Sequence, residues 1–161
     1  MPRLSPDGKM IAYSAQDSLN RTMVWIRRLN SLETVPVPGT ENCRPPFWSP
    51  DSRYIGFVSD GKLKKVAVAG GPAQVICDAP SGSDGAWSKD DVILFDGAGA
   101  DPIYRVNAGG GVKTVAIPGD SVKQVGWPMF LPDGKHFFYS GIGNNGTGQT
   151  FVGTLGKTTG K

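Results

Sequence analysis

A short turn motif occurs four times along the chain, and its regular spacing constrains the fold more than any other feature of the sequence. Each copy follows a bulky apolar residue and precedes a short run of β-branched and aromatic residues. The copies are Ser5-Pro6-Asp7-Gly8-Lys9, Ser49-Pro50-Asp51-Ser52-Arg53, Ser88-Lys89-Asp90-Asp91 and Leu131-Pro132-Asp133-Gly134-Lys135. Their second residues lie 44, 39 and 43 positions apart. A period of this length indicates a repeat protein with one supersecondary unit per copy.

The residue types of the motif suit a tight turn. Proline presets φ at the first corner, aspartate caps the turn through its side chain, and glycine takes the positive φ that other residues resist. We therefore predict that the motif is structural. The residues expected to form its turns are Pro6, Asp7, Gly8, Pro50, Asp51, Pro132, Asp133 and Gly134.

Each repeat contains further segments that are typical of β-strands. An apolar run follows each turn, at Met10–Tyr13, Tyr54–Phe57, Val92–Phe95 and His136–Tyr139. A second run follows in every unit, and a third follows in the first three units. Four short antiparallel strands per repeat are typical of the blade of a β-propeller. The first unit lacks its inner strand and the last its outer strand, which leaves about fourteen strands where four blades need sixteen.

We therefore predict an all-β chain that forms a partial β-propeller of about four four-stranded antiparallel blades, of which the first and last are incomplete. The single domain is expected to divide into blades at residues 1–40, 41–80, 81–121 and 122–161. Essentially no helix is expected, because no stretch of ten or more residues combines helical spacing with freedom from the 23 glycines and 13 prolines. Since propellers close with at least four blades and usually more, we expect missing sequence to supply the remaining blades.

The segment Phe47–Phe57, Phe-Trp-Ser-Pro-Asp-Ser-Arg-Tyr-Ile-Gly-Phe, resembles the repeat of TolB-type, WD-repeat-like propellers. That repeat has an aromatic residue, Ser-Pro-Asp-Gly, a basic residue and an apolar strand. The resemblance covers nearly the whole chain. Three further segments, Val24–Leu32, Asp60–Val66 and Ala69–Pro72, are most similar to the propeller that follows the kinase domain in certain bacterial membrane serine/threonine kinases. The motifs of a kinase domain itself do not occur in this sequence.

The resemblance implies a non-catalytic scaffold that binds a protein partner or senses a ligand. Such a scaffold could be a TolB-like binder in the bacterial envelope or the extracytoplasmic sensor part of a kinase. The alternative is the propeller portion of a hydrolase, such as a prolyl-peptidase-like enzyme, whose catalytic domain would lie outside this chain. Periplasmic or extracytoplasmic localisation is suggested by the resemblance alone, and the sequence itself leaves the compartment open.

Charge and cysteine patterns argue against several other classes of partner. The formal net charge is +3 and the lysines and arginines are dispersed, so nucleic acid is not an expected partner. No apolar run approaches about 18 residues, so this segment is not expected to insert into a membrane. Cys43 and Cys77 lack the spacing of a zinc site, and the sequence does not determine whether they form a disulfide. We expect no cofactor and no metal.

Three constellations that resemble catalytic or binding motifs have simpler explanations. The G-x-G-x-x-G pattern at 141–146 precedes a predicted strand, so no helix N-terminus is available to receive a pyrophosphate, and we predict a hairpin loop. His136 opens a strand without a nucleophile elbow nearby. Asp90 and Asp91 are adjacent in a turn and cannot flank a substrate from two sides. We therefore expect no catalytic residues in this chain.

The aromatic residues at the ends of the predicted inner strands fall into two groups. Trp48 and Trp87 occupy the same position before the turn motif, so we expect both to pack between blades. Trp127 lies three residues before the position equivalent to theirs, which is Phe130, and the repeat gives it no packing role. Exposed aromatic residues often anchor protein interfaces. We therefore predict a possible interaction surface that contains Trp127 and Phe47.

Overall fold

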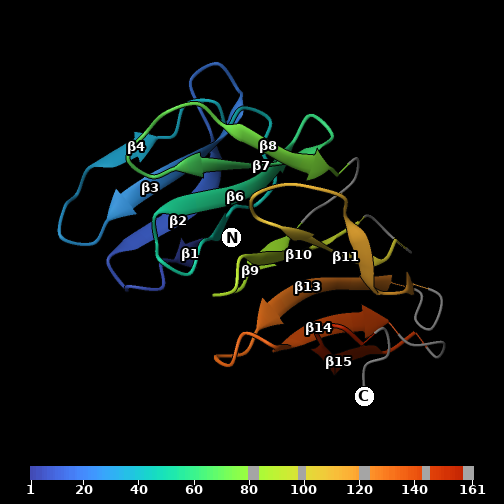
Figure 1. Cartoon of the computed structure of the whole chain (residues 1–161). Coiled ribbons are helices and arrows are strands. Elements are labelled where there is room, and N and C mark those ends of the chain that lie inside the picture. The colour runs from blue at the N-terminus through green and yellow to red at the C-terminus, as the bar shows by residue number, and fades with distance from the viewer. Residues whose placement is uncertain (80–83, 98–100, 120–123, 143–145, 158–161) are drawn as a thin grey trace.

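The computed structural model describes residues 1–79, 84–97, 101–119, 124–142 and 146–157, and these ranges form an all-β structure of four antiparallel sheets. The sheets are the blades of a β-propeller and stand around a common centre near the N-terminus (Figure 1). Within the described ranges there is no α-helix, and accordingly no helix that is long and apolar enough to cross a membrane. The predicted fold class is confirmed.

The strands of each blade follow one another in the sequence and pair with their nearest neighbours. Blade 1 contains β1 (Arg3–Leu4), β2 (Met10–Gln16), β3 (Thr22–Arg28) and β4 (Thr34–Pro36). Blade 2 contains β5 (Phe47–Trp48), β6 (Tyr54–Ser59), β7 (Lys62–Ala67) and β8 (Gln74–Asp78). Blade 3 contains β9 (Gly85–Trp87), β10 (Val92–Asp96), β11 (Ile103–Asn107) and β12 (Thr114–Ile117). Blade 4 contains β13 (Gln124–Phe130), β14 (His136–Ile142) and β15 (Gly148–Thr154).

The first blade is complete, which corrects the expectation that it lacks its inner strand. Arg3 and Leu4 form the two-residue strand β1 and pair with Ala12 and Ile11 of β2. A strand this short shows no alternation of apolar and polar residues, so periodicity could not reveal it. The last blade has three strands in the described part of the chain, as expected, and β15 forms its outer edge there.

The repeated motif closes with a backbone hydrogen bond in every blade, and the side-chain hydrogen bonds that support it differ between blades. In blade 2 the Ser49 hydroxyl donates to Asp51 Oδ1 over 2.6 Å, and the Arg53 N–H donates to the same oxygen over 3.0 Å. The Tyr54 N–H donates to Ser49 Oγ over 2.8 Å, which ties the turn to the start of β6. The fourth turn position takes a left-handed conformation, with φ of 71° at Gly8 and Gly134 and 61° at Ser52.

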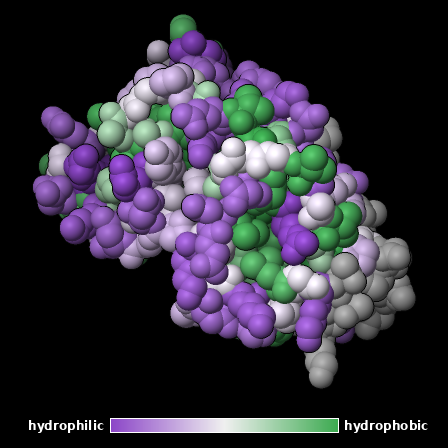
Figure 2. Space-filling model, in the orientation of Figure 1, coloured by the Kyte–Doolittle hydropathy of each residue, from purple (hydrophilic) through white to green (hydrophobic). Residues whose placement is uncertain are grey.

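Buried apolar residues form three core clusters, one at each boundary between successive blades. Ile55 and Phe57 lie in the cluster between blades 1 and 2, and Phe95 lies in the cluster between blades 2 and 3. Phe137 lies in the cluster between blades 3 and 4. Among the described residues, no cluster joins blade 4 to blade 1. The outline of the molecule is notched between these two blades (Figure 2).

Candidate functional site

A pocket opens near the centre of the propeller, where residues of blades 1, 3 and 4 meet. Its volume is about 360 Å³. Its walls combine apolar side chains with an ion pair and three hydroxyl-bearing side chains. The lining residues are Met1, Arg3, Asp84, Trp127, Pro128, Met129, Phe138, Tyr139, Ser140 and Thr150.

Trp127 is the most exposed aromatic residue of this pocket, and an irregularity in β13 places it there. The register between β13 and β14 shifts between Gly126 and Met129, so Trp127 lies in a bulge. Its φ is 52°, a left-handed conformation that a bulky side chain rarely adopts, and 59% of its surface is exposed. Bulges of this kind often redirect a side chain near a functional site. The bulge therefore explains structurally why Trp127 is exposed, as the sequence predicted.

The buried carboxylate of Asp96 stabilises the strained segment. The Trp127 N–H donates to Asp96 Oδ2 over 3.3 Å, and the Asp84 N–H donates to Asp96 Oδ1 over 2.8 Å. Gly126 lies against the same carboxylate, because a Cβ at this position would be 2.6 Å from Asp96 Oδ2. Asp96 therefore links the inner strand of blade 4 to the residue that precedes the inner strand of blade 3.

Asp84 forms an ion pair with Arg3 across the centre of the propeller. The Arg3 guanidinium donates to Asp84 Oδ2 over 2.5 Å, and the Gly85 N–H donates to Asp84 Oδ1 over 2.8 Å. Burial raises the pKa of the Asp84 carboxyl, and the nearby Arg3 charge lowers it in part. Both oxygens of Asp84 are thus occupied by structural contacts. The two carboxylate oxygens of Asp96 are also occupied by structural contacts, because they accept the backbone N–H groups of Asp84 and Trp127.

The chemistry of this pocket favours binding. Its apolar surface includes the side chains of Trp127, Met129 and Phe138, and its charged groups are the Arg3–Asp84 pair. The described residues contain no group of three His, Cys, Asp or Glu side chains that could hold a metal ion. An amphipathic segment of a partner, with an apolar side chain next to a polar group, suits such a surface.

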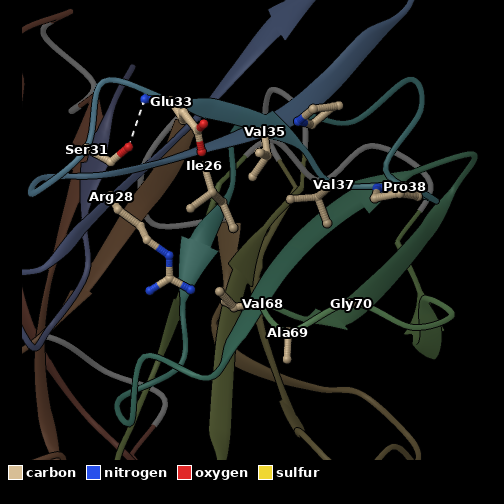
Figure 3. Close-up of a pocket in the computed structure, with 11 residues that line it drawn as sticks. Ile26, Arg28, Ser31, Glu33, Val35, Val37, Pro38, Val68, Ala69 and Gly70 are labelled. Atoms are coloured by element: carbon tan, nitrogen blue, oxygen red, sulfur yellow. Dashed lines mark hydrogen bonds between the residues drawn. The ribbon is translucent and has the colours of Figure 1, made fainter.

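A second pocket, of about 210 Å³, lies between β4 of blade 1 and the turn that follows β7 of blade 2 (Figure 3). Its floor is formed by Ile26, Val37 and Val68, while Arg28 and Glu33 lie on its walls (Figure 3). No aromatic side chain and no buried charged group lines it. We therefore regard it as a gap between two blades and assign the candidate site to the central pocket.

The structure separates the aromatic residues that the sequence grouped together. Phe47 is buried, and its ring contacts the backbone positions of Gly56 and Gly85 between blades 2 and 3. It is therefore part of the core in this chain, and its ring offers no surface to a partner. Trp48 is buried as expected, and its indole N–H donates to the Arg3 carbonyl over 2.9 Å. Trp87 is only half-buried, tilted against Tyr54 at a ring-centroid distance of 6.2 Å.

The residues that the sequence excluded from catalysis occupy structural positions. His136 Nδ1 lies 2.5 Å from Asp133 Oδ2, within the last turn motif. Asp91 accepts a hydrogen bond from the Trp87 indole over 3.1 Å. Cys43 and Cys77 are free, and burial raises the pKa of the Cys43 thiol to about 11, which opposes a nucleophilic role. The G-x-G-x-x-G pattern includes residues 143–145, which lie outside the described ranges.

Sequence reasoning missed Arg3, Asp84 and Asp96. Arg3 and Asp84 are 81 positions apart, and no local spacing connects them. Asp96 ends a strand of apolar residues, where a carboxylate is usually solvent-exposed. The only signal in the sequence was the residue type at the position of Asp96. The equivalent strand-end position holds an apolar or hydroxyl-bearing residue in the other repeats, namely Ser14, Val58 and Ser140.

Comparison with known sequences gives two partial matches, and no family model matches the chain. A Bacillus subtilis (strain 168) protein described as the uncharacterized peptidase YuxL is 32% identical over 102 residues, which are 55% of this chain and 15% of that protein. The uncharacterized protein Atu1656 of Agrobacterium fabrum (strain C58 / ATCC 33970) is 32% identical over 108 residues, 60% of this chain and 35% of that protein. The chain thus spans about a third or less of these relatives.

Comparison with solved structures gives matches over the whole chain. A TolB protein of Agrobacterium tumefaciens superposes with a TM-score of 0.82 at 19% identity, covering 99% of this chain and 59% of that one. The β-propeller domain of the Trilobed protease of Pyrococcus furiosus, which has an open velcro topology, superposes with a TM-score of 0.68 at 19% identity, covering 100% and 55%. At these identities the likeness shows the fold, a TolB-like β-propeller.

Proposed function

We propose that this chain is a β-propeller scaffold that binds a protein partner, and that the central pocket around Trp127 is its recognition surface. The observation that carries this proposal is the conformation of Trp127. A large aromatic side chain is held in solvent by a left-handed backbone and by a hydrogen bond to a buried carboxylate. Strained residues with such support cluster at functional sites, and exposed tryptophans are frequent interface anchors.

The surroundings of Trp127 support protein binding in preference to catalysis. Met129 is 56% exposed beside it, and together they present apolar surface at the pocket mouth. Asp84 and Asp96 hold backbone groups and Arg3, so they already have structural partners. A binding scaffold of this kind resembles the TolB-like role implied by the sequence repeat, for which an extracytoplasmic location is expected.

A second candidate function is the propeller portion of a peptidase. It is supported by the 32% identity to the Bacillus subtilis protein described as a peptidase and by the superposition on the Trilobed protease propeller. The kinase-sensor role also remains a prediction, which rests on the sequence resemblance alone. Translation of the flanking DNA distinguishes these roles. A G-x-S-x-G domain would support the peptidase, and a kinase domain with a membrane span would support the sensor.

The partner-binding proposal is tested by replacing Trp127 with alanine. The immobilised chain would be incubated with envelope extract from the encoding bacterium, and captured proteins would be quantified by mass spectrometry. We expect Trp127→Ala to lose at least tenfold of the captured partner, because anchor residues contribute about 2 kcal/mol or more. Leu32→Ala is the matched control, since Leu32 is 89% exposed and lies outside the pocket. Equal capture by wild type and Trp127→Ala, with equal melting temperatures, would contradict the proposal.

A further inference from the structure

A third pocket lies between the turn motifs of blades 2 and 3, and we call it the inter-turn pocket. Its volume is about 320 Å³, within the range of roughly 300 to 1,000 Å³ that is typical of small-molecule sites. Its walls combine two aromatic rings, two carboxylates and two ammonium groups with small turn residues. The lining residues are Ser49, Pro50, Asp51, Tyr54, Lys65, Trp87, Lys89 and Asp91. Since none of them lines the central pocket, the inter-turn pocket is a separate surface.

The turn of blade 3 is shorter than the turns of the other blades. The position that it lacks holds a basic residue in the other repeats, namely Lys9, Arg53 and Lys135. Between blades 1 and 2 the turns are tied together, because the Asp7 N–H donates to Ser52 Oγ over 3.1 Å. Among the described residues, no hydrogen bond ties the turn of blade 2 to that of blade 3 in this way. The inter-turn pocket therefore lies at the irregular turn of the repeat.

Trp87 differs from its counterpart in blade 2 in both hydrogen bonding and exposure. The buried Trp48 donates its indole N–H to the Arg3 carbonyl of the preceding blade over 2.9 Å. Trp87 instead donates its indole N–H to Asp91 Oδ1 of its own turn over 3.1 Å, and it is half-buried. The Tyr54 ring lies beside it, with the two ring planes 34° apart. Trp87 therefore offers ring surface to the pocket, while its N–H already has a partner.

The charged groups of the pocket balance one another. Asp51 Oδ1 accepts two hydrogen bonds within its own turn. Lys65 Nζ donates to the Ala108 carbonyl over 2.9 Å and lies 5.6 Å from the centroid of the Tyr54 ring. Lys89 is exposed, and its ammonium group has no hydrogen bond or ion pair with any described residue. With two carboxylates and two ammonium groups, the lining has no net charge.

We propose that the inter-turn pocket binds a neutral pyranose sugar. A pyranose has an apolar face of C–H groups, which packs on the electron-rich face of an aromatic ring. Its hydroxyl groups donate to carboxylates and accept from ammonium groups. Trp87 supplies the ring surface. Asp51 and Asp91 supply acceptors, and Lys89 supplies donors. The site is independent of the partner-binding proposal, because it does not include Trp127.

Ligands with a net charge fit this lining less well. A cation is attracted to aromatic faces, but Lys65 already lies over Tyr54, and Lys89 lines the same pocket. An anion is attracted to the two lysines but is opposed by Asp51 and Asp91. Like charges placed together across a binding surface are unfavourable. The charge balance therefore favours a ligand that is neutral and rich in hydrogen-bonding groups.

Saturation-transfer difference NMR on the purified chain tests the proposal. The probes are the methyl glycosides of glucose, galactose, mannose and N-acetylglucosamine, each titrated separately. At least one glycoside should bind with a dissociation constant on the order of 1 mM, as expected for a ligand of this size. Because the probe is neutral, its affinity should change by less than about twofold between low and high salt. Choline, acetate and glycine serve as cationic, anionic and zwitterionic comparison probes.

Two variants locate the bound sugar. Trp87→Ala should weaken binding of the glycoside by about tenfold, because the stacking surface is removed. Lys89→Ala should weaken it by about threefold or more through the loss of a hydrogen-bond donor. Trp25→Ala is the matched control, because Trp25 is also half-buried, donates its indole N–H to a carbonyl over 3.2 Å and lies outside the pocket. It should bind like the wild type, and circular dichroism would establish that the variants fold alike.

Several results would overturn the proposal. If no glycoside binds at millimolar concentration, the pocket is not a sugar site. Tighter binding of choline, acetate or glycine than of every glycoside would show that the pocket selects a charged ligand. Glycoside binding that survives both Trp87→Ala and Lys89→Ala, or that Trp25→Ala weakens equally, would show that the sugar binds elsewhere. Because Lys89 is exposed on a turn, its variant decides the matter even if Trp87→Ala fails to fold.

Discussion

At the scale of single residues, the central pocket depends on how closely the backbone of β13 approaches a buried carboxylate. Gly126 leaves room for Asp96, and Asp96 accepts the N–H of Trp127. The absence of a side chain at residue 126 and the exposure of the next residue are therefore linked. A periodic sequence pattern carries no information about such a contact, because it depends on two strands from different blades.

Gly126→Ala should destabilise the fold. Its Cβ would lie 2.6 Å from Asp96 Oδ2, a distance that forces the carboxylate or β13 to move. We expect a loss of about 1 to 3 kcal/mol in the free energy of unfolding, typical of overpacking a well-packed site. Urea denaturation measures this value. Gly148→Ala is the control, since nothing lies within 4 Å of the position that its Cβ would occupy; an equal loss there would exclude the Asp96 contact as the cause.

Asp51→Ala should remove a turn cap and cost about 1 kcal/mol near pH 7. Hydrogen bonds from the Ser49 hydroxyl and the Arg53 N–H lower the pKa of Asp51. The stabilisation is therefore complete above the unfolded-state pKa of about 3.9, and it is lost as pH falls through the lower folded-state pKa. Denaturant titrations between pH 7 and pH 2 should show the difference from wild type vanish at the acidic end. A difference that persists at pH 2 would argue against a role of the charged carboxylate.

At the scale of single elements, equivalent positions in different blades differ in burial. Trp48 fills the boundary between blades 1 and 2, whereas Trp87 is partly solvent-exposed and bonds to Asp91. The third repeat is one residue shorter at its turn, and Asp91 takes the left-handed position with φ of 57°. The sequence pattern predicted the same strand for both tryptophans, and it could not indicate how tightly each is covered.

Trp48→Ala should therefore cost more stability than Trp87→Ala. Removal of the buried Trp48 ring should lower the free energy of unfolding by about 3 to 5 kcal/mol. The loss at Trp87 should be clearly smaller, since part of its surface already contacts water. Guanidinium unfolding of both variants gives the two values. Equal losses would indicate that Trp87 is as well covered in solution as Trp48.

At the scale of the whole molecule, the repeat predicted the blade architecture, because each unit repeats the same strand and turn chemistry. It did not predict the first strand, which is two residues long, or the contacts among Arg3, Asp84 and Asp96. The contact between Arg3 and Asp84 joins blades 1 and 3, and all of these contacts depend on the final packing. The exposure of Trp127 was predicted because this tryptophan departs from the sequence repeat. For the candidate site, such departures were more informative than the repeat itself.

Blades 2 and 3 have neighbours on both faces, whereas blades 1 and 4 have one each among the described residues. In repeat arrays, stability is distributed according to such neighbour contacts. Hydrogen exchange should therefore be slower in β6 and β10 than in β2 and β14. Mass spectrometry of peptides from each strand gives the order. Equal protection in all four blades would imply that the chain unfolds as one cooperative unit.

The ion pair between Arg3 and Asp84 also has a consequence for folding kinetics. It joins residues 81 positions apart, so it can form only after the intervening blades have taken their places. We therefore expect this contact to be absent from the folding transition state and to have a φ-value near zero. Replacement of Arg3 should therefore speed unfolding and leave the folding rate nearly unchanged. The contact made by the N-terminal strand would then limit the unfolding rate and so determine the lifetime of the folded state.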